Sequence, residues 1–195
     1  TLRNREVTKR DLDRVIESAT AGAQPADREV IHVMPQEFIV DGERKIKDPV
    51  GLYGVKLEAK IHMVTAQVTQ AKNLVKCVHN SGVDVQSLVL EQIASSEAVL
   101  TPDERDVGVV LLDCGGGTTD IAVFSDGAIK YTSNITIGGD FLDNDISFGL
   151  GASKQVAKEI KERYGIASAD LVDGEDEIKI DKIAGTGRKK ISQLE

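Results

Sequence analysis

The stretch from residue 113 to residue 120 reads Asp113-Cys114-Gly115-Gly116-Gly117-Thr118-Thr119-Asp120. Apolar runs flank it on both sides, at 107–112 and 121–124, and both have the composition of buried strands. The pattern predicts that one strand delivers a carboxylate at its carboxyl end, that three glycines reverse the chain, and that a second strand follows. We expect a third strand over 128–137 after the Asp126-Gly127 turn, so the three strands should form an antiparallel meander.

The three glycines of this turn are suited to binding an anion. Glycine has no Cβ, so the turn can adopt positive φ and its backbone N–H groups can approach a phosphate closely. Thr118 or Thr119 could add a hydroxyl donor, and Asp113 could hold a water molecule of hydrated Mg²⁺. The metal is needed because the carboxylate would repel a bare phosphate. A glycine-rich hairpin turn without a ligand is also common, and that alternative stays open for the glycines taken alone.

A second glycine turn, Gly138-Gly139-Asp140, follows the meander and opens a helix. Unpaired N–H donors and the helix dipole favour negative charge at such a place. The two glycine turns leave the same small sheet, so they could face one nucleotide from two sides. Asp140 could equally serve only as the N-cap of the helix.

The residues before the meander alternate between helical and extended patterns. The expected elements are a helix over 9–20, an extended segment over 30–40, an alternating strand over 55–63, a helix that ends at Asn80-Ser81-Gly82, and a strand over 83–93. Together they predict an α+β unit over residues 29–93. The alternation of the third element places His62 on its solvent side.

The remaining segments divide the chain and complete its second half. We expect a short helix over 94–100, a charged connector over 101–106, a helix after Gly139 that breaks between Gly149 and Gly151, and a further helix from Ser153 to Gly165. The connector is the best boundary between domains. Acidic and then basic residues between 170 and 190 are interpreted as solvated surface.

Composition excludes several classes of protein. The chain has 195 residues with 24 Lys+Arg and 32 Asp+Glu, and its net charge of −8 disfavours nucleic-acid binding. The apolar run at 107–112 is far shorter than the roughly 20 residues of a membrane-spanning helix. Cys77 and Cys114 lack partners at ligand spacing, so we expect core thiols in a reducing cytosol and no zinc site. Because the chain begins with Thr1 and carries no signal peptide, it is interpreted as a piece of a longer protein.

The order strand, glycine turn, strand, Gly-Gly-Asp and helix resembles the second phosphate segment of the superfamily of actin, DnaK-type chaperones and sugar kinases. Over nearly all of its length the chain is similar to the FtsA family of bacterial cell-division proteins. The segments that carry this similarity are HVMPQEF (32–38), DPVGLYGVKLE (48–58), HMVT (62–65), NLVKCV (73–78), LVLEQIASSEAVL (88–100) and GGDFLDNDISFGL (138–150).

This resemblance implies a fold of mixed α+β and α/β class, in which an actin-like (RNase H-like) ATPase subdomain is preceded by a small inserted α+β subdomain. In the terms of the family, residues 1–28 would be the end of subdomain 1A and residues 29–93 the inserted subdomain 1C. Residues 94–106 would connect it to subdomain 2A, the nucleotide-binding lobe, which would occupy 107–195 and enter subdomain 2B.

The resemblance also implies ATP and Mg²⁺ as cofactors of the full-length protein, with Asp113 holding the metal through water. The implied set for phosphate and Mg²⁺ is Asp113, Gly115, Gly116, Gly117, Thr118, Thr119, Gly138, Gly139 and Asp140. The family's first phosphate segment and its adenosine segment are expected outside this chain. We therefore expect the chain alone to bind MgATP weakly or not at all.

The function implied by the resemblance is that of an ATP-binding adaptor in septum formation. Such a protein tethers the FtsZ ring to the inner face of the cytoplasmic membrane, helps recruit later division proteins, and forms filaments through its 1C unit. The FtsZ contact and the amphipathic membrane helix are expected in parts outside this chain, and no nucleic-acid partner is expected.

Two other functions stay open at this point. One is a phosphotransferase or ATPase of the same superfold, and the other is a PilM-like protein of pilus assembly, which has a similar insertion. No residue of the sequence is identified as catalytic, and no nucleophile elbow, Walker motif or Gly-x-Gly-x-x-Gly turn is present. We therefore expect no enzyme, with slow ATP hydrolysis by the full-length protein as the alternative.

Overall fold

The computed structural model describes residues 2, 4–23, 25–172, 177–181 and 188–192. These residues form two compact units. Unit 1 consists of Thr1–Asp113 and Ile121–Ser133, and unit 2 consists of Cys114–Asp120 and Asn134–Glu195. The chain has the mixed α/β architecture that the sequence predicts.

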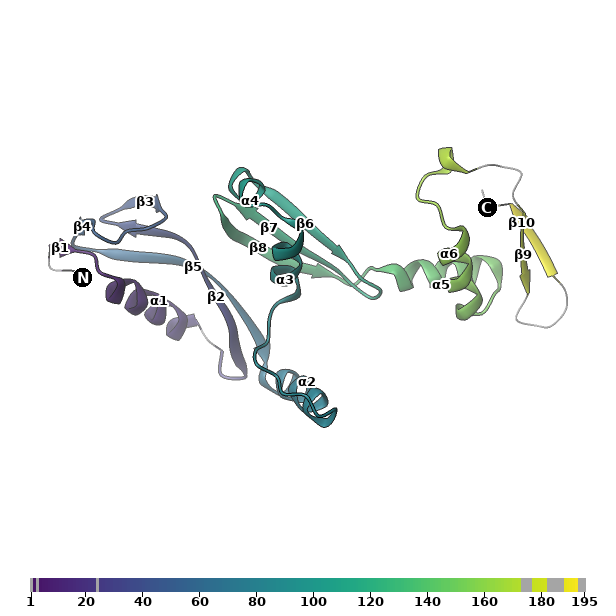
Figure 1. Cartoon of the computed structure of the whole chain (residues 1–195), viewed down its shortest axis with the longest axis horizontal. Helices are drawn as coiled ribbons and strands as arrows, with labels where there is room; N and C mark the ends of the chain where they lie inside the picture. Colours follow the sequence, from purple (N-terminus) through teal and green to yellow (C-terminus); the bar gives the residue numbers. More distant parts are fainter. Residues whose placement is uncertain (1, 3, 24, 173–176, 182–187, 193–195) are drawn as a thin grey trace. The chain divides into compact units, whose positions relative to one another are not determined.

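The first half of unit 1 is built around a three-stranded sheet of order β3-β2-β5, against which helix α1 packs along β5 and β2 (Figure 1). The elements are β1 (Arg5–Glu6), α1 (Lys9–Ala23), β2 (Arg28–Val40), β3 (Glu43–Ile46), β4 (Tyr53–Gly54), β5 (Leu57–Gln67) and α2 (Val68–Asn80). β2 and β5 run antiparallel from the pair Arg28 and Gln67 to the pair Val40 and Leu57. The predicted helix over 9–20, extended segment over 30–40 and helix end at Asn80 are confirmed.

The second half of unit 1 contains strands of the predicted meander, in the order β6-β7-β8. Its elements are α3 (Glu91–Val99), α4 (Pro102–Val107), β6 (Val109–Cys114), β7 (Thr119–Ser125) and β8 (Ala128–Ile135), and each strand continues into unit 2. The core of this sheet consists of Leu111, Ala122, Phe124 and Ile129. Met34 of β2 packs against the same core, so the two sheets of unit 1 share apolar contacts.

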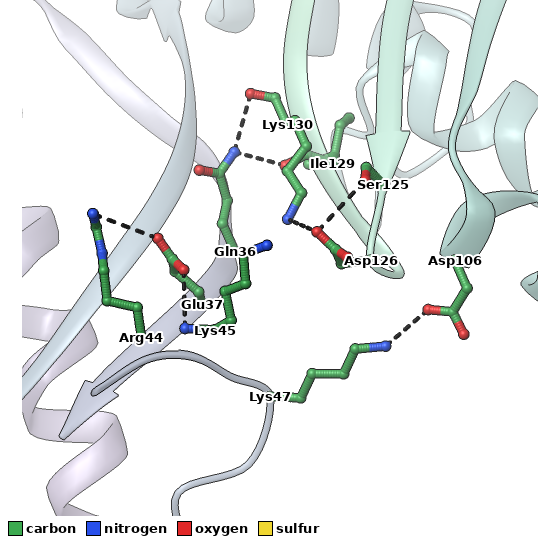
Figure 2. A network of polar contacts seen from close by, with 10 residues as sticks. All are labelled: Gln36, Glu37, Arg44, Lys45, Lys47, Asp106, Ser125, Asp126, Ile129 and Lys130. Carbon is green, nitrogen blue, oxygen red and sulfur yellow. Dashed lines mark hydrogen bonds and ion pairs between the residues drawn. The ribbon is translucent and has the colours of Figure 1, made fainter. Parts of the chain in front are cut away.

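Polar contacts also join the hairpin β2–β3 to the hairpin β7–β8 within unit 1 (Figure 2). The Gln36 side chain donates through Nε2 to the carbonyl oxygens of Ile129 and Lys130, at 2.8 and 3.0 Å. Lys47 and Asp106 form a 2.8 Å ion pair nearby, but both side chains are more than half exposed. Exposed ion pairs contribute about 0–1 kcal/mol, so the Gln36 amide and the shared apolar core are the main links.

Unit 2 contains two packed helices, α5 (Gly139–Leu150) and α6 (Lys154–Tyr164), the short helix η1 (Ala169–Leu171), and two antiparallel strands, β9 (Glu177–Asp181) and β10 (Arg188–Ser192). α5 passes through Gly149 and ends at Leu150, since Gly151 adopts the left-handed conformation with φ of 62°. The helix expected from Ser153 is confirmed as α6, and the Ser153 side chain caps it by accepting from Val156 N. The predicted surface runs fall mainly outside the described side chains, because nothing is described for the side chains of 173–177 or 179–195.

The strand expected over 83–93 is wrong. Residues 83–90 have no regular secondary structure, and α3 begins at Glu91. Val83 and Val89 are 57% and 54% exposed, so these apolar side chains do not mark a buried strand. The segment is tied down instead by the Leu90 amide, which donates to His32 Nε2 at 3.0 Å.

The charged connector expected over 101–106 is a helix, α4. Thr101 and Glu104 form a complete capping box, in which each side chain accepts from the backbone N–H of the other residue. Pro102 occupies the first turn, where its missing N–H costs nothing. The capping box and Pro102 therefore start a helix here, although residues 101–106 lack the apolar periodicity that usually marks one.

Two expectations about side-chain burial are also wrong. His62 is partly buried rather than solvated: its Nε2 lies 3.0 Å from Thr132 Oγ1, and burial lowers the pKa of the imidazole. The alternation identified the strand, but Thr132 of β8 contacts one of the side chains that were assigned to solvent. Cys77 and Cys114 are free thiols, but both are exposed and neither lies in a core.

Asp11 stabilises the start of α1 through hydrogen bonds to Arg5 and Thr8. Its carboxylate accepts bonds from the Arg5 guanidinium at 2.6 and 2.7 Å and from the Thr8 amide at 2.9 Å, and these contacts lower its pKa far below the usual range. A depressed pKa in the folded state adds stability that is present above the unfolded pKa of about 4 and is lost as the pH falls below it.

We expect Asp11→Asn to lower the urea midpoint at about pH 7 and to leave a smaller difference between about pH 7 and about pH 3 than the unchanged chain shows. Circular dichroism measures both midpoints. Asp13→Asn, an exposed carboxylate on the same helix, is the control. An unchanged pH dependence in Asp11→Asn would contradict this assignment.

Candidate phosphate-binding site

The first glycine turn is closed by one backbone hydrogen bond, from Gly115 N to Thr118 O at 2.8 Å. None of Gly115, Gly116 and Gly117 adopts positive φ, although the sequence argument allowed for it. All three are exposed. Close approach is tight at Gly115, where a Cβ would lie 3.2 Å from Thr118 O, whereas a Cβ at Gly117 would meet nothing within 4 Å.

The second glycine turn makes this close approach. Gly139 N donates to Gly115 O at 3.0 Å, and Asp140 N donates to Gly116 O at 2.8 Å. A Cβ at Gly138 would lie 2.5 Å from Gly116 O and 2.6 Å from Gly115 O. Because both neighbours are main-chain atoms, only glycine fits at position 138 without moving one turn away from the other.

The amides that start α5 are therefore engaged by the first turn, and this changes how the helix can act on an anion. Each of these amides donates to a carbonyl group of the first turn. The same peptide group also contains the N–H of the following residue in that turn. The bond to Gly115 O leads to the amide of Gly116, and the bond to Gly116 O leads to the amide of Gly117. Among the described residues, no protein acceptor is found for the amides of Gly116 and Gly117. These two N–H groups are the donors that the glycines of the turn can offer to an anion.

Both threonine hydroxyls of the first turn donate to protein atoms. Thr119 Oγ1 donates to Ile137 O at 2.7 Å, next to the second turn, and Thr118 Oγ1 lies 3.1 Å from Asp120 Oδ2. In this arrangement the hydroxyl groups hold the two turns in place. Their contact with phosphate remains a prediction.

Asp113 lies one residue before the end of β6 and belongs to unit 1. Its Oδ2 accepts a hydrogen bond from Ser95 Oγ of α3 at 2.5 Å, which fixes the orientation of the carboxylate. In the part of the chain that the structure describes, no three His, Cys, Asp or Glu side chains gather to bind a metal directly. A single oriented carboxylate suits Mg²⁺ bound through its waters, because this ion keeps several of them.

Two residues near the turns were missed by sequence reasoning. Lys161 of α6 donates to Gly139 O at 2.8 Å and pairs with Asp143 of α5 at 2.7 Å. Asp143 is only 6% exposed. The sequence offered one signal, the acidic residue Asp143 among the apolar positions of α5. Its partner Lys161 could not be identified in this way, because it lies 18 residues further along the chain.

Comparison with known proteins identifies relatives of both halves of the chain. The family model described as "SHS2 domain inserted in FTSA" matches residues 1–65, and the model described as "Cell division protein FtsA" matches residues 110–195.

Cell division protein FtsA of Pseudomonas aeruginosa is 43% identical over 192 residues, which are 98% of this chain and 46% of that protein. Cell division protein FtsA of Escherichia coli K12 is 39% identical over 180 residues, 92% of this chain and 43% of that protein. The chain thus spans about half the length of the curated relatives it matches.

Two solved structures resemble the chain. A chain of the PilM-PilN type IV pilus biogenesis complex matches with a TM-score of 0.59 and 13% identity, over 83% of this chain and 46% of its own length. MreB5 of Spiroplasma citri bound to ADP matches with a TM-score of 0.49 and 24% identity, over 66% of this chain and 41% of its own. The family models and the match to the PilM-PilN complex confirm the predicted actin-like fold with an inserted domain.

A second prediction follows from the contact between the turns. Gly138→Ala should lower the free energy of unfolding by about 1–3 kcal/mol, because the new methyl group overlaps two main-chain oxygens. Gly149→Ala is the matched control: its Cβ meets nothing within 4 Å, and alanine should stabilise α5 by roughly 1 kcal/mol. Urea unfolding of both variants measures the difference. A Gly138→Ala chain as stable as the unchanged one would show that the turns do not meet.

Proposed function

The chain belongs to the FtsA family of cell-division proteins, and from this premise we propose that the complete protein binds ATP with Mg²⁺ at the two glycine turns. The observation that carries the proposal is the pair of open amides, those of Gly116 and Gly117, in an exposed turn held at the start of a helix. Adjacent N–H groups at such a place form a concave donor site for an anion.

Electrostatics favour the magnesium complex over free ATP. Asp140 Oδ1 would lie 3.5 Å from a Cβ at Gly116, so a carboxylate stands beside the first turn. Asp113 adds a second carboxylate shortly before that turn in the sequence. Negative charges near a triphosphate are unfavourable without a cation between them. We propose that Asp113 holds Mg²⁺ through water, and that Gly115 and Thr118 keep the turn closed around the phosphates.

The proposed role in the cell is that of an adaptor. In this proposal the complete protein links FtsZ to the inner face of the cytoplasmic membrane and helps recruit later division proteins. Contacts between inserted domains, here residues 1–65, would contribute to filament formation. No helix among the described residues has the length and apolar character to span a bilayer. In this proposal an amphipathic helix in another part of the complete protein makes the membrane contact.

We propose that ATP acts as a ligand of this adaptor and is hydrolysed slowly or not at all. In-line hydrolysis needs a group that orients or deprotonates water. Two carboxylates that could serve in this way are already paired: Asp113 accepts from Ser95, and Asp143 pairs with Lys161. Identity of 39–43% to FtsA proteins, against 13% to a chain of the PilM-PilN complex, favours cell division over pilus assembly.

A third prediction tests the binding of ATP. Gly116→Val in the full-length protein should weaken MgATP binding at least tenfold, about 1.4 kcal/mol, because a branched side chain beside the open amides occupies the space of a phosphate oxygen. Isothermal titration calorimetry measures the dissociation constant. Gly22→Val, an open position at the end of α1, is the control and should bind as the unchanged protein does. Equal affinity of the Gly116→Val and unchanged proteins would refute the role of this turn.

A further inference from the structure

Lys161 is joined to the first glycine turn by a continuous series of hydrogen bonds. Its ammonium group donates to Gly139 O at 2.8 Å. The same peptide group presents the N–H of Asp140, which donates to Gly116 O at 2.8 Å. That carbonyl belongs to the peptide group whose N–H is the open amide of Gly117. Two peptide groups therefore lie between a positive charge and a donor of the proposed phosphate site.

Each link of such a series polarises the next. A cation at a carbonyl oxygen draws electron density through the peptide group and makes its N–H a stronger donor, and condensed-phase estimates put the strengthening at roughly 10–30% per bond. From these contacts we propose that Lys161 is a positioning residue of the phosphate site, which polarises the Gly117 amide and fixes the second turn against the first. This inference rests on the proposed binding of ATP.

Asp143 keeps the ammonium group in place. It is 6% exposed, its carboxylate lies 2.7 Å from Lys161 Nζ, and it projects from α5, the helix that the second turn opens. Lys161 is itself three-quarters buried, on the facing helix α6. Nζ would also lie 3.3 Å from a Cβ at Gly139, so the ammonium group sits directly over the second turn. The pair ties both helices of unit 2 to one peptide group.

An ordinary structural ion pair would act differently from this series of bonds. If the pair only stabilised the packing of α5 on α6, removing both charges together would restore the site, because no buried charge would be left alone. If Lys161 acts through Gly139 O, removing both charges restores the folding but not the polarisation of Gly117. The double variant therefore distinguishes the two roles: MgATP affinity recovers if the pair only stabilises packing, and stays low if Lys161 polarises the Gly117 amide.

The test compares four full-length proteins: unchanged, Lys161→Met, Lys161→Met with Asp143→Asn, and Lys158→Met as control. Lys158 lies on the same helix and pairs at 3.9 Å with Glu162, with both side chains more than half exposed. Calorimetry measures binding of MgATP and of adenosine, which has no phosphate. Nuclear magnetic resonance of ¹⁵N-glycine-labelled protein without nucleotide measures the amide proton of Gly117.

We expect both Lys161 variants to bind MgATP about tenfold more weakly and adenosine within about twofold of the unchanged protein. The Gly117 proton should move upfield in both, and Lys158→Met should change neither quantity. Recovery of MgATP affinity in the double variant, or an unmoved Gly117 proton, would overturn the inference. If the unchanged protein binds no MgATP, the proposed function fails; the Gly117 proton then still shows whether Lys161 polarises the turn.

Discussion

The contact between the main chains of the two glycine turns is the constraint on which the rest of unit 2 depends. With Gly138 between them, the carbonyl groups of Gly115 and Gly116 can accept bonds from the first amides of α5. The N–H groups of Gly139 and Asp140 at the start of the helix are therefore not offered to an anion. Their hydrogen bonds polarise the two peptide groups that contain the amides of Gly116 and Gly117. Glycine is needed at position 138 because the two main chains approach closely there, and none of the three glycines of the first turn adopts positive φ.

Unit 1 shows how the domain matched over residues 1–65 can share contacts with the sheet that follows it in the chain. Met34 packs into the core of the β6–β8 sheet, and the Gln36 amide binds two carbonyl groups of β8. Both residues lie on β2 beside Pro35, which has no N–H to donate, and the pairing of β2 with β5 shifts register between Pro35 and Glu37. The irregularity occurs at the point where β2 contacts the second sheet, and it lies within a stretch of strong sequence resemblance to the family.

Sequence reasoning succeeded where one local signal decided the outcome. The alternation before residue 63 identified β5, and Ser153 and Gly165 bounded α6 correctly. It failed where tertiary contacts decided: His62 is covered by Thr132, 70 residues away, and the apolar segment after Gly82 finds no strand to pair with. The missed helix α4 is different, since the Thr101 and Glu104 capping box was readable. For the site, both turns were found from their glycines, but the mutual engagement of their amides and carbonyls and the role of Lys161 require coordinates.

The central claim is that the amides of Gly116 and Gly117 hold the phosphates of ATP. A crystal structure of the full-length protein with Mg²⁺ and a non-hydrolysable ATP analogue measures this directly. The account predicts both amide nitrogens within about 3.2 Å of phosphate oxygens, with Gly139 and Asp140 still bonded to the first turn. Phosphates bound elsewhere, or turns separated by the nucleotide, would contradict it.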